Sequence, residues 1–178
     1  REYIRECDEK EVYPEGLLSK MGKLGWFGLR APEVYGGSEM GAMDLAIFLE
    51  EVSRGMVAAA QIYYSLYLIG LHYINNFGNE EQKRYYFPCL IRNEMRFSFA
   101  LTEPNAGSDA ASLTMSATPD GDYFLLNGQK TFITGAKKSN VILVMVRTDK
   151  SLPKHKGISM FLVDSNTDGI VMRPLKKL

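Results

Sequence analysis

The hydrophobic pattern of this 178-residue chain changes its period once, close to residues 93–96. Before that point, apolar residues recur three and four positions apart, which places their side chains on one face of an α-helix. After it, apolar and polar residues alternate or form short continuous apolar runs, as in β-strands. The switch predicts an α+β chain, with an all-α domain over residues 1–94 followed by a β-barrel or sandwich over residues 95–178.

The first part of the chain is expected to form helices over residues 14–24, 44–52, 57–77 and 79–93. Gly25 is placed to end the first helix, because glycine adopts the left-handed conformation that follows many helices. The 57–77 segment is apolar on most faces, which predicts a central, buried helix. Asn79 and Gln82 have the spacing of a capping box, in which each side chain accepts a backbone N–H from the other residue.

The second part is expected to form short strands separated by turns. Asp120-Gly121 marks one turn, and Asn127-Gly128 predicts a type I′ hairpin between YFLL and QKTFIT. The run VILVMVR lacks alternation, which indicates a strand that is buried on both faces. The expected strands are RFSFALT, SLTMSAT, YFLL, QKTFIT, VILVMVR, GISMFLV and IVMRP.

Charge and cysteine content narrow the functional classes. The chain has 21 basic and 21 acidic side chains, so its net charge does not favour a nucleic-acid or membrane-surface partner. No stretch of about 20 consecutive apolar residues is present, so no membrane span is expected. Cys7 and Cys89 are expected to be reduced thiols of an intracellular protein, and with two histidines in the chain no metal site is predicted.

The ends of the chain lead us to expect a fragment of a longer protein. The sequence begins at Arg1 within a charged stretch and stops at RPLKKL without a recognisable final element. Lys176 and Lys177 are expected to be solvent-exposed.

Small polar residues are concentrated in one stretch, TEPNAGSD at residues 102–109. Such residues allow a flat, polar ligand to approach the backbone closely. The alternative interpretation is structural: Thr102 and Thr134 are then ordinary strand residues, Gly107 and Ser108 an ordinary turn, and Phe132 a core aromatic.

Two longer motifs resemble those of the acyl-CoA dehydrogenase flavoprotein family. They are RFSFALTEPNAGSD and, about twenty residues later, LNGQKTFITGA. APEVYGG and FGNEEQKRYYFPCLIRNE resemble further family motifs and occur in the same order. The resemblance covers nearly the whole chain, and it implies the N-terminal helical and middle β domains of that family, without a Rossmann unit.

The resemblance also implies an FAD site. Thr102 is expected near the N1/O2 edge of the flavin, the Thr134 hydroxyl at N5, and Ser108 where the flavin meets the thioester substrate. Phe132 is expected to pack against the ring at a position where many relatives carry tryptophan, so no indole is available there for electron exit. The complete expected cofactor set is Phe99, Leu101, Thr102, Gly107, Ser108, Phe132, Ile133 and Thr134.

For the whole protein, the resemblance implies oxidation of an acyl-CoA to a trans-2-enoyl-CoA, with hydride transfer to flavin N5. Electron-transferring flavoprotein is the expected acceptor, a homotetramer the expected assembly, and bacterial cytoplasm or mitochondrial matrix the expected location. The catalytic glutamate is expected in a C-terminal helical domain beyond residue 178, so no catalytic residue is assigned and the fragment is expected to be inactive.

Three alternatives remain open from the sequence. The same fold also occurs in acyl-CoA oxidases and in reductases that convert an enoyl-CoA to an acyl-CoA. The segment ECDEKEVYPEG faintly resembles crotonobetainyl-CoA reductases, which belong to the second group. The third alternative is a module without catalytic activity that binds a partner protein and no flavin.

Overall fold

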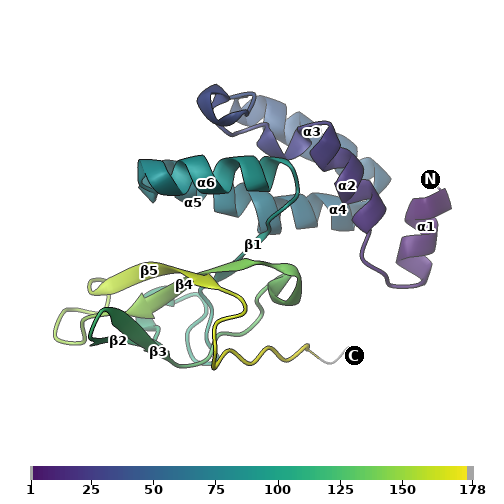
Figure 1. Ribbon diagram of the computed structural model, residues 1–178. Helices are drawn as coiled ribbons and strands as arrows, with labels where there is room; N and C mark the ends of the chain where they lie inside the picture. Colours follow the sequence, from purple (N-terminus) through teal and green to yellow (C-terminus); the bar gives the residue numbers. More distant parts are fainter. Residues whose placement is uncertain (1, 176–178) are drawn as a thin grey trace. The chain divides into compact units, whose positions relative to one another are not determined.

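The computed structural model describes residues 2–175, and the chain divides into two compact units, Arg1–Arg96 and Phe97–Leu178. The first unit is helical and the second contains the β-sheet (Figure 1). The expected helical domain followed by a β domain is therefore confirmed. The expected exposure of Lys176 and Lys177 lies outside the described residues.

The helical unit begins with two short helices that hydrogen bond to each other. The backbone N–H of Gly16 donates to the hydroxyl oxygen of Tyr3 over 3.0 Å. Gly25 adopts a left-handed φ of 70° after the second helix, as expected for a residue that ends it. The elements of this unit are α1 Glu2–Glu9, α2 Glu15–Lys23, η1 Trp26–Gly28, η2 Glu33–Tyr35, α3 Ala42–Gly55, α4 Val57–Tyr63, η3 Tyr64–Leu68, α5 Ile69–Phe77 and α6 Glu80–Ile91.

The helix expected over residues 57–77 is present as α4, η3 and α5 in direct succession, with a π-helical turn at η3. It is central, as expected. Tyr63 and Tyr67 are fully buried, and the ring of Tyr67 stacks on Phe27 with 3.6 Å between centroids. Stacked and buried aromatic rings of this kind contribute much of a small core's hydrophobic free energy.

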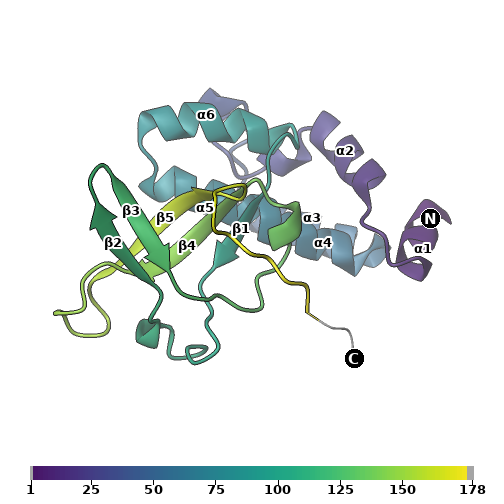
Figure 2. The ribbon, with the colours of Figure 1, turned by 60° about the horizontal axis from the view of Figure 1, so that its bottom comes forward.

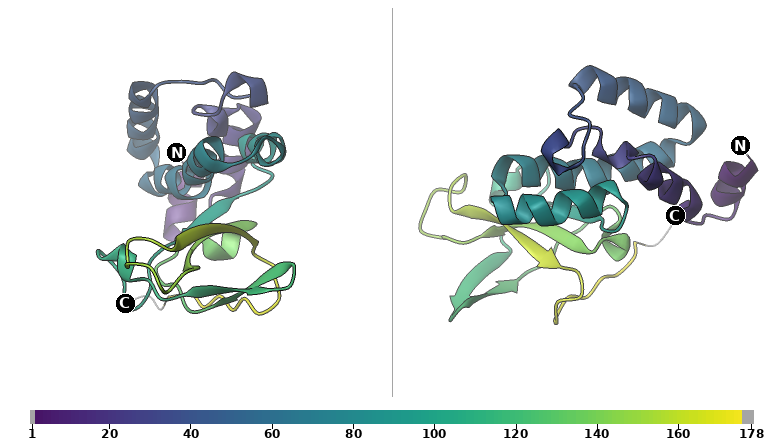
Figure 3. Two further views of the ribbon diagram at one scale, coloured as in Figure 1. Left: turned by 90° about the vertical axis from the view of Figure 1, so that its left-hand side faces the viewer. Right: turned by 45° about the horizontal axis from the view of Figure 1, so that its top comes forward.

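The predicted capping box at the start of α6 is confirmed. The Gln82 N–H donates to Asn79 Oδ1 over 2.8 Å, and the Asn79 N–H donates to Gln82 Oε1 over 2.9 Å. Both bonds satisfy backbone donors that the first turn of a helix leaves without a partner. The helix so begun packs along α5 (Figures 1 and 3).

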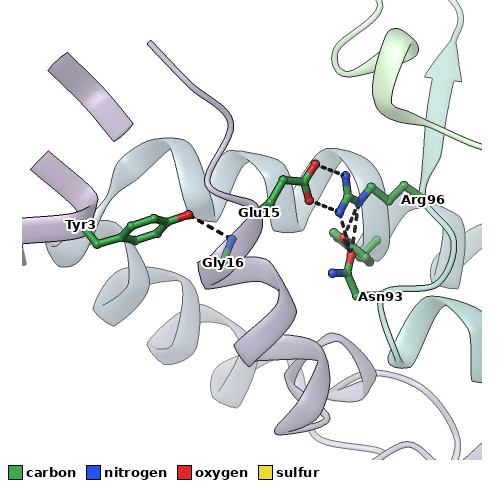
Figure 4. Close-up of polar contacts among 6 residues, drawn as sticks. Tyr3, Glu15, Gly16, Asn93 and Arg96 are labelled. Atoms are coloured by element: carbon green, nitrogen blue, oxygen red, sulfur yellow. Dashed lines mark hydrogen bonds and ion pairs between the residues drawn. The ribbon is translucent and has the colours of Figure 1, made fainter. Parts of the chain in front are cut away.

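A polar network joins the start of α2 to the end of the helical unit (Figure 4). The Arg96 guanidinium, whose side chain is 12% exposed, donates to Glu15 Oε1 over 3.1 Å and to Glu15 Oε2 over 2.6 Å. It also donates to the Tyr67 hydroxyl over 2.9 Å and to Asn93 Oδ1 over 3.2 Å. The network fixes the residue that directly precedes the first strand.

The second unit contains one mixed, five-stranded sheet (Figure 2). Its longest buried strand, β4, pairs in parallel with β1 and with the start of β2, and antiparallel with β5 along its whole length. β2 and β3 form a hairpin at Asp120-Gly121, where a turn was expected. The elements are β1 Phe97–Ala100, η4 Ala110–Ser112, β2 Ser116–Asp120, β3 Tyr123–Asn127, η5 Ala136–Lys138, β4 Val141–Arg147 and β5 Ile158–Asp164.

The core of this sheet lies around β4. Ile142, Val144 and Val146 pack with Ala100 and Ala117, and Ile133 packs against this cluster from a neighbouring loop. On the opposite face of the strand Leu143 is also fully buried. The prediction that VILVMVR is buried on both faces is thus confirmed.

Two expected strands are not strands, QKTFIT at residues 129–134 and IVMRP at 170–174. The Asn127-Gly128 hairpin is absent because Gly128, at φ 153°, packs so closely on Met115 that an added Cβ would lie 2.6 Å from the Met115 Cβ. Phe132 then adopts a left-handed φ of 58°, which interrupts an extended strand. At the start of the second of these segments, the Ile170 N–H donates to the Thr167 carbonyl oxygen within a turn, and not to a neighbouring strand.

Candidate functional site

The two threonine-bearing segments predicted to hold a cofactor meet in the β unit. One begins where β1 ends, at Leu101 and Thr102, and the other runs from Lys130 to Thr134 between β3 and η5. The backbone N–H of Thr131 donates to the carbonyl oxygen of Thr102 over 2.9 Å. The second segment leads through η5 into β4, which pairs in parallel with β1.

A buried ion pair joins the same two segments. Lys130 Nζ lies 2.9 Å from Glu103 Oε1, and the side chains are only 7% and 4% exposed. The same ammonium group donates to the carbonyl oxygen of Leu101 over 2.9 Å. Sequence reasoning did not identify this pair, although both residues lie inside the quoted motifs.

The Glu103 carboxylate is surrounded by donors. Its Oε2 accepts from the N–H and the hydroxyl of Thr114 at 2.7 and 2.8 Å, and its Oε1 accepts from the Met115 N–H at 2.9 Å. Burial by itself would raise the pKa of Glu103, but the hydrogen bonds from Lys130, Thr114 and Met115 outweigh it and lower the pKa to about 2. Glu103 is therefore ionised at neutral pH.

The side chains of residues 132–134 alternate in exposure. Ile133 packs against the sheet core, whereas Thr134 is exposed and Phe132 is 71% exposed. The interpretation of Phe132 as a core aromatic is therefore wrong. The left-handed backbone of Phe132 is strained, and the exposed ring gains little from burial in return. The conformation of this loop is therefore not explained by stability alone.

The remaining candidate residues lie along the first segment. Phe99 and Leu101 are half-buried in and just after β1. A tight turn in which Glu103 and Ala106 exchange two backbone hydrogen bonds then leads to Gly107 and Ser108, which are exposed. The structure thus joins Thr102 to the 130–134 segment directly, and places Gly107 and Ser108 in the loop beyond the turn.

A positively charged cavity of about 290 Å³ lies next to that loop. It is lined by Ala111, Ser112, Arg147, Lys150, Leu152 and Lys154. Arg147 is buried, and its guanidinium donates to four carbonyl oxygens, those of Ala111, Leu113, Lys154 and Lys156. Lys154 also pairs with Asp109 at 2.6 Å. The 107–113 loop is therefore tied to the 150–156 loop, an arrangement that the sequence analysis did not predict.

Residues 2–175 contain no helix with the length and apolar character that a membrane span requires. No three histidine, cysteine or acidic side chains gather there in a way that would hold a metal ion.

Comparison with known proteins assigns both units to one family. The acyl-CoA dehydrogenase N-terminal domain model matches residues 1–94, and the acyl-CoA dehydrogenase middle domain model matches residues 98–178. The chain is 41% identical over 167 residues to the 3-(aryl)acrylate reductase of Clostridium sporogenes, with 93% of this chain and 44% of that protein covered. It is 39% identical over 173 residues to the caffeyl-CoA reductase-Etf complex subunit CarC of Acetobacterium woodii, covering 96% and 45%.

A solved structure shows the same arrangement of elements. It is an acyl-CoA dehydrogenase from Bacillus anthracis complexed with FAD, with a TM-score of 0.85 and 32% identity, covering 98% of this chain and 30% of that one. The chain thus spans less than half the length of these relatives. On the evidence of both domain models and of this structural similarity, the chain belongs to the acyl-CoA dehydrogenase family.

Proposed function

We propose that this chain supplies the helical and flavin-binding units of an FAD-dependent oxidoreductase that acts on CoA thioesters. The observation that carries the proposal is the contact between the two threonine-bearing segments, in which the Thr131 N–H meets the Thr102 carbonyl oxygen. Support for FAD comes from the similar Bacillus anthracis structure, which was solved as a complex with that cofactor.

The chemistry of the two segments fits a flavin. An isoalloxazine ring needs hydrogen-bond partners along one edge and apolar atoms against its faces. The exposed Thr134 hydroxyl and the backbone around Thr102 offer the former, and the exposed ring of Phe132 offers the latter. Ile133 anchors the second segment in the sheet core, so these groups are held on a packed support.

The charged cavity beyond Ser108 supports a CoA thioester as the substrate. Lys150, Lys154 and the buried Arg147 line the cavity, and Asp109 offsets one of these three positive charges. The positive charge that remains suits the phosphate groups of CoA. Ser108 lies next to Asp109, whose carboxylate pairs with Lys154. We therefore retain Ser108 as the residue where the substrate and the cofactor site adjoin.

When bound, FAD would supply hydride transfer to or from its N5 atom. The residues of this chain would orient the cofactor: Thr134 by donating a hydrogen bond to N5, Thr102 by a hydrogen bond near N1/O2, and Phe132 by packing against the ring. Fixed donors of this kind lower the energy of charge that develops during the reaction. We assign no catalytic base within residues 2–175, because the resemblance implies a glutamate outside them in that role.

Reduction of an enoyl-CoA is the second candidate reaction. Two of the most similar relatives are reductases, and one of them belongs to a complex with Etf. We therefore propose electron-transferring flavoprotein as the redox partner in either direction, together with the homotetramer and the bacterial or mitochondrial location that the resemblance implies.

Anaerobic spectroscopy of the whole protein tests the proposal. We expect a yellow protein with bound FAD, whose visible absorbance bleaches with an acyl-CoA if the enzyme is a dehydrogenase. In the reductase, the chemically reduced protein regains its absorbance when an enoyl-CoA is added. A protein that takes up no FAD, even when FAD is added, contradicts the proposal and favours the partner-binding module.

A further inference from the structure

The Glu103–Lys130 ion pair contacts both segments that we propose for the flavin. Lys130 belongs to the second segment, yet its ammonium group bonds two residues of the first, the carbonyl oxygen of Leu101 and the carboxylate of Glu103, each at 2.9 Å. The adjacent residue Thr131 donates its N–H to the Thr102 carbonyl oxygen, also over 2.9 Å. Residues 101–103 of the first segment are thus bonded to Lys130 and Thr131 of the second.

This pair is an unusual choice if stability were its only role. Removing two charges from water costs several kcal/mol per ion, and apolar residues of similar volume often replace a buried pair without loss of stability. Here both side chains are at least nine-tenths buried, and all the named contacts of Lys130 are to the first segment. A charged pair with fixed hydrogen bonds does, however, determine the relative position of two loops more narrowly than apolar packing does.

The geometry points to Glu103 and Lys130 as a positioning pair for the flavin site, which sets the register between the 101–103 and 130–134 segments without touching the cofactor. This inference rests on the proposed function. Through the Leu101 and Thr102 carbonyl groups, the pair fixes the backbone from which Thr102 and Thr134 would reach the flavin edge. The role is comparable to that of outer hydrogen-bond partners, which orient the ligands of a bound metal.

Two variants of the whole protein test the inference. Lys130→Met removes the ammonium group and keeps the apolar stem, and Glu103→Gln/Lys130→Met removes both charges together. We expect FAD affinity to fall about 10- to 100-fold in each, the range found when outer partners of metal ligands are lost. In the cofactor-free protein, the Thr131 amide should exchange with solvent faster relative to the amides of β4.

Val141→Ala is the matched control. Val141 is buried at the start of β4 and does not belong to the cluster against which Ile133 packs, so its truncation destabilises the unit without removing a contact of the two segments. We expect this variant to bind FAD with unchanged affinity at a temperature well below its unfolding transition. Its Thr131 amide should keep its protection relative to β4.

The outcomes separate the inference from the function on which it rests. If the unchanged protein binds no FAD, the proposed function fails. If it binds FAD and both charge variants bind equally well with the Thr131 amide still protected, this inference alone fails. Failure of both charge variants to fold also contradicts it, because the pair would then support the whole unit rather than the two segments.

Discussion

The backbone N–H of Thr131 donates a 2.9 Å hydrogen bond to the carbonyl oxygen of Thr102. The two residues lie 29 positions apart in the sequence. Lys130 and Leu101, which are separated by the same number of positions, are also hydrogen bonded. The bond between Thr131 and Thr102 places the exposed side chains of residues 132 and 134 beside the end of β1. The proposed role of these residues in flavin binding depends on this contact.

Thr134→Val tests the proposed hydrogen bond to flavin N5. We expect the rate of hydride transfer to fall by less than about 100-fold, because loss of one preorganised donor costs about 10²–10³-fold and other contacts along the ring edge remain. The visible spectrum of the bound flavin should shift as well. Thr118→Val, an exposed strand position in β2, is the control and should change neither. An unchanged rate and spectrum in Thr134→Val would contradict the assignment.

Phe132→Gly should separate stability from cofactor binding. Phe132 has a φ of 58° and its side chain is 71% exposed, so glycine removes backbone strain of about 1–2 kcal/mol at little cost in burial. Part of that gain is lost to the greater chain entropy of glycine when unfolded. We expect the thermal midpoint of the cofactor-free protein to stay level or rise, while FAD affinity falls. A lower midpoint together with unchanged FAD affinity would show that Phe132 has a structural role.

Acid should destabilise the β unit through Glu103. The folded-state pKa of this carboxyl is about 2, against an ordinary value of 4.5. The stabilisation is present above pH 4.5 and is lost as pH falls from 4.5 to 2, because the unfolded chain binds the proton first. The free energy of unfolding lost in this pH range is about 3 kcal/mol. Urea unfolding followed by circular dichroism should show this loss in the natural protein. Glu103→Gln should be less stable at neutral pH and should lack that part of the acid dependence.

Arg96→Met should destabilise the helical unit by about 2 kcal/mol, since hydrogen bonds to charged groups contribute about 1.5–3 kcal/mol. The bonds lost are those to Glu15, Tyr67 and Asn93. Fluorescence of Trp26 reports on this unit, because Trp26 is the one tryptophan in the chain.

Arg92→Met provides the control for Arg96→Met. Arg92 pairs with Glu94 at 2.7 Å, but both side chains are more than half exposed. Such a surface pair contributes about 0–1 kcal/mol. Equal losses of stability in the two variants would contradict the role assigned to the Arg96 network.

Local sequence signals predicted the elements whose causes are local. The capping box at Asn79 and Gln82 depends on two residues three positions apart, and it was found as predicted. The apolar run of β4 likewise determined its burial. Gly25 ends α2 because glycine, which has no side chain, readily adopts the left-handed conformation found there.

Tertiary contacts decided the features that the sequence did not predict. Asn127-Gly128 has the composition of a hairpin turn, but close packing of Gly128 on Met115 directs the chain away from β3. Glu103 and Lys130 lie 27 positions apart, so no helix or strand period relates them. The available signal was Lys130, the one charged residue of LNGQKTFITGA, together with an acidic residue, Glu103, in the other motif. The convergence of Arg147, Lys150 and Lys154 on one cavity likewise depends on how two loops fold back.

The most direct measurement of the central claim is an FAD titration of the ¹⁵N-labelled chain, followed through its backbone amide signals. If the flavin binds at the two threonine-bearing segments, saturable changes are concentrated at residues 101–108 and 131–135, with small changes on β2, β3 and the helical unit. Even weak binding by this chain alone is visible in such a titration. Changes confined to other residues, or no saturable change at any FAD concentration, would rule out a flavin site at these two segments.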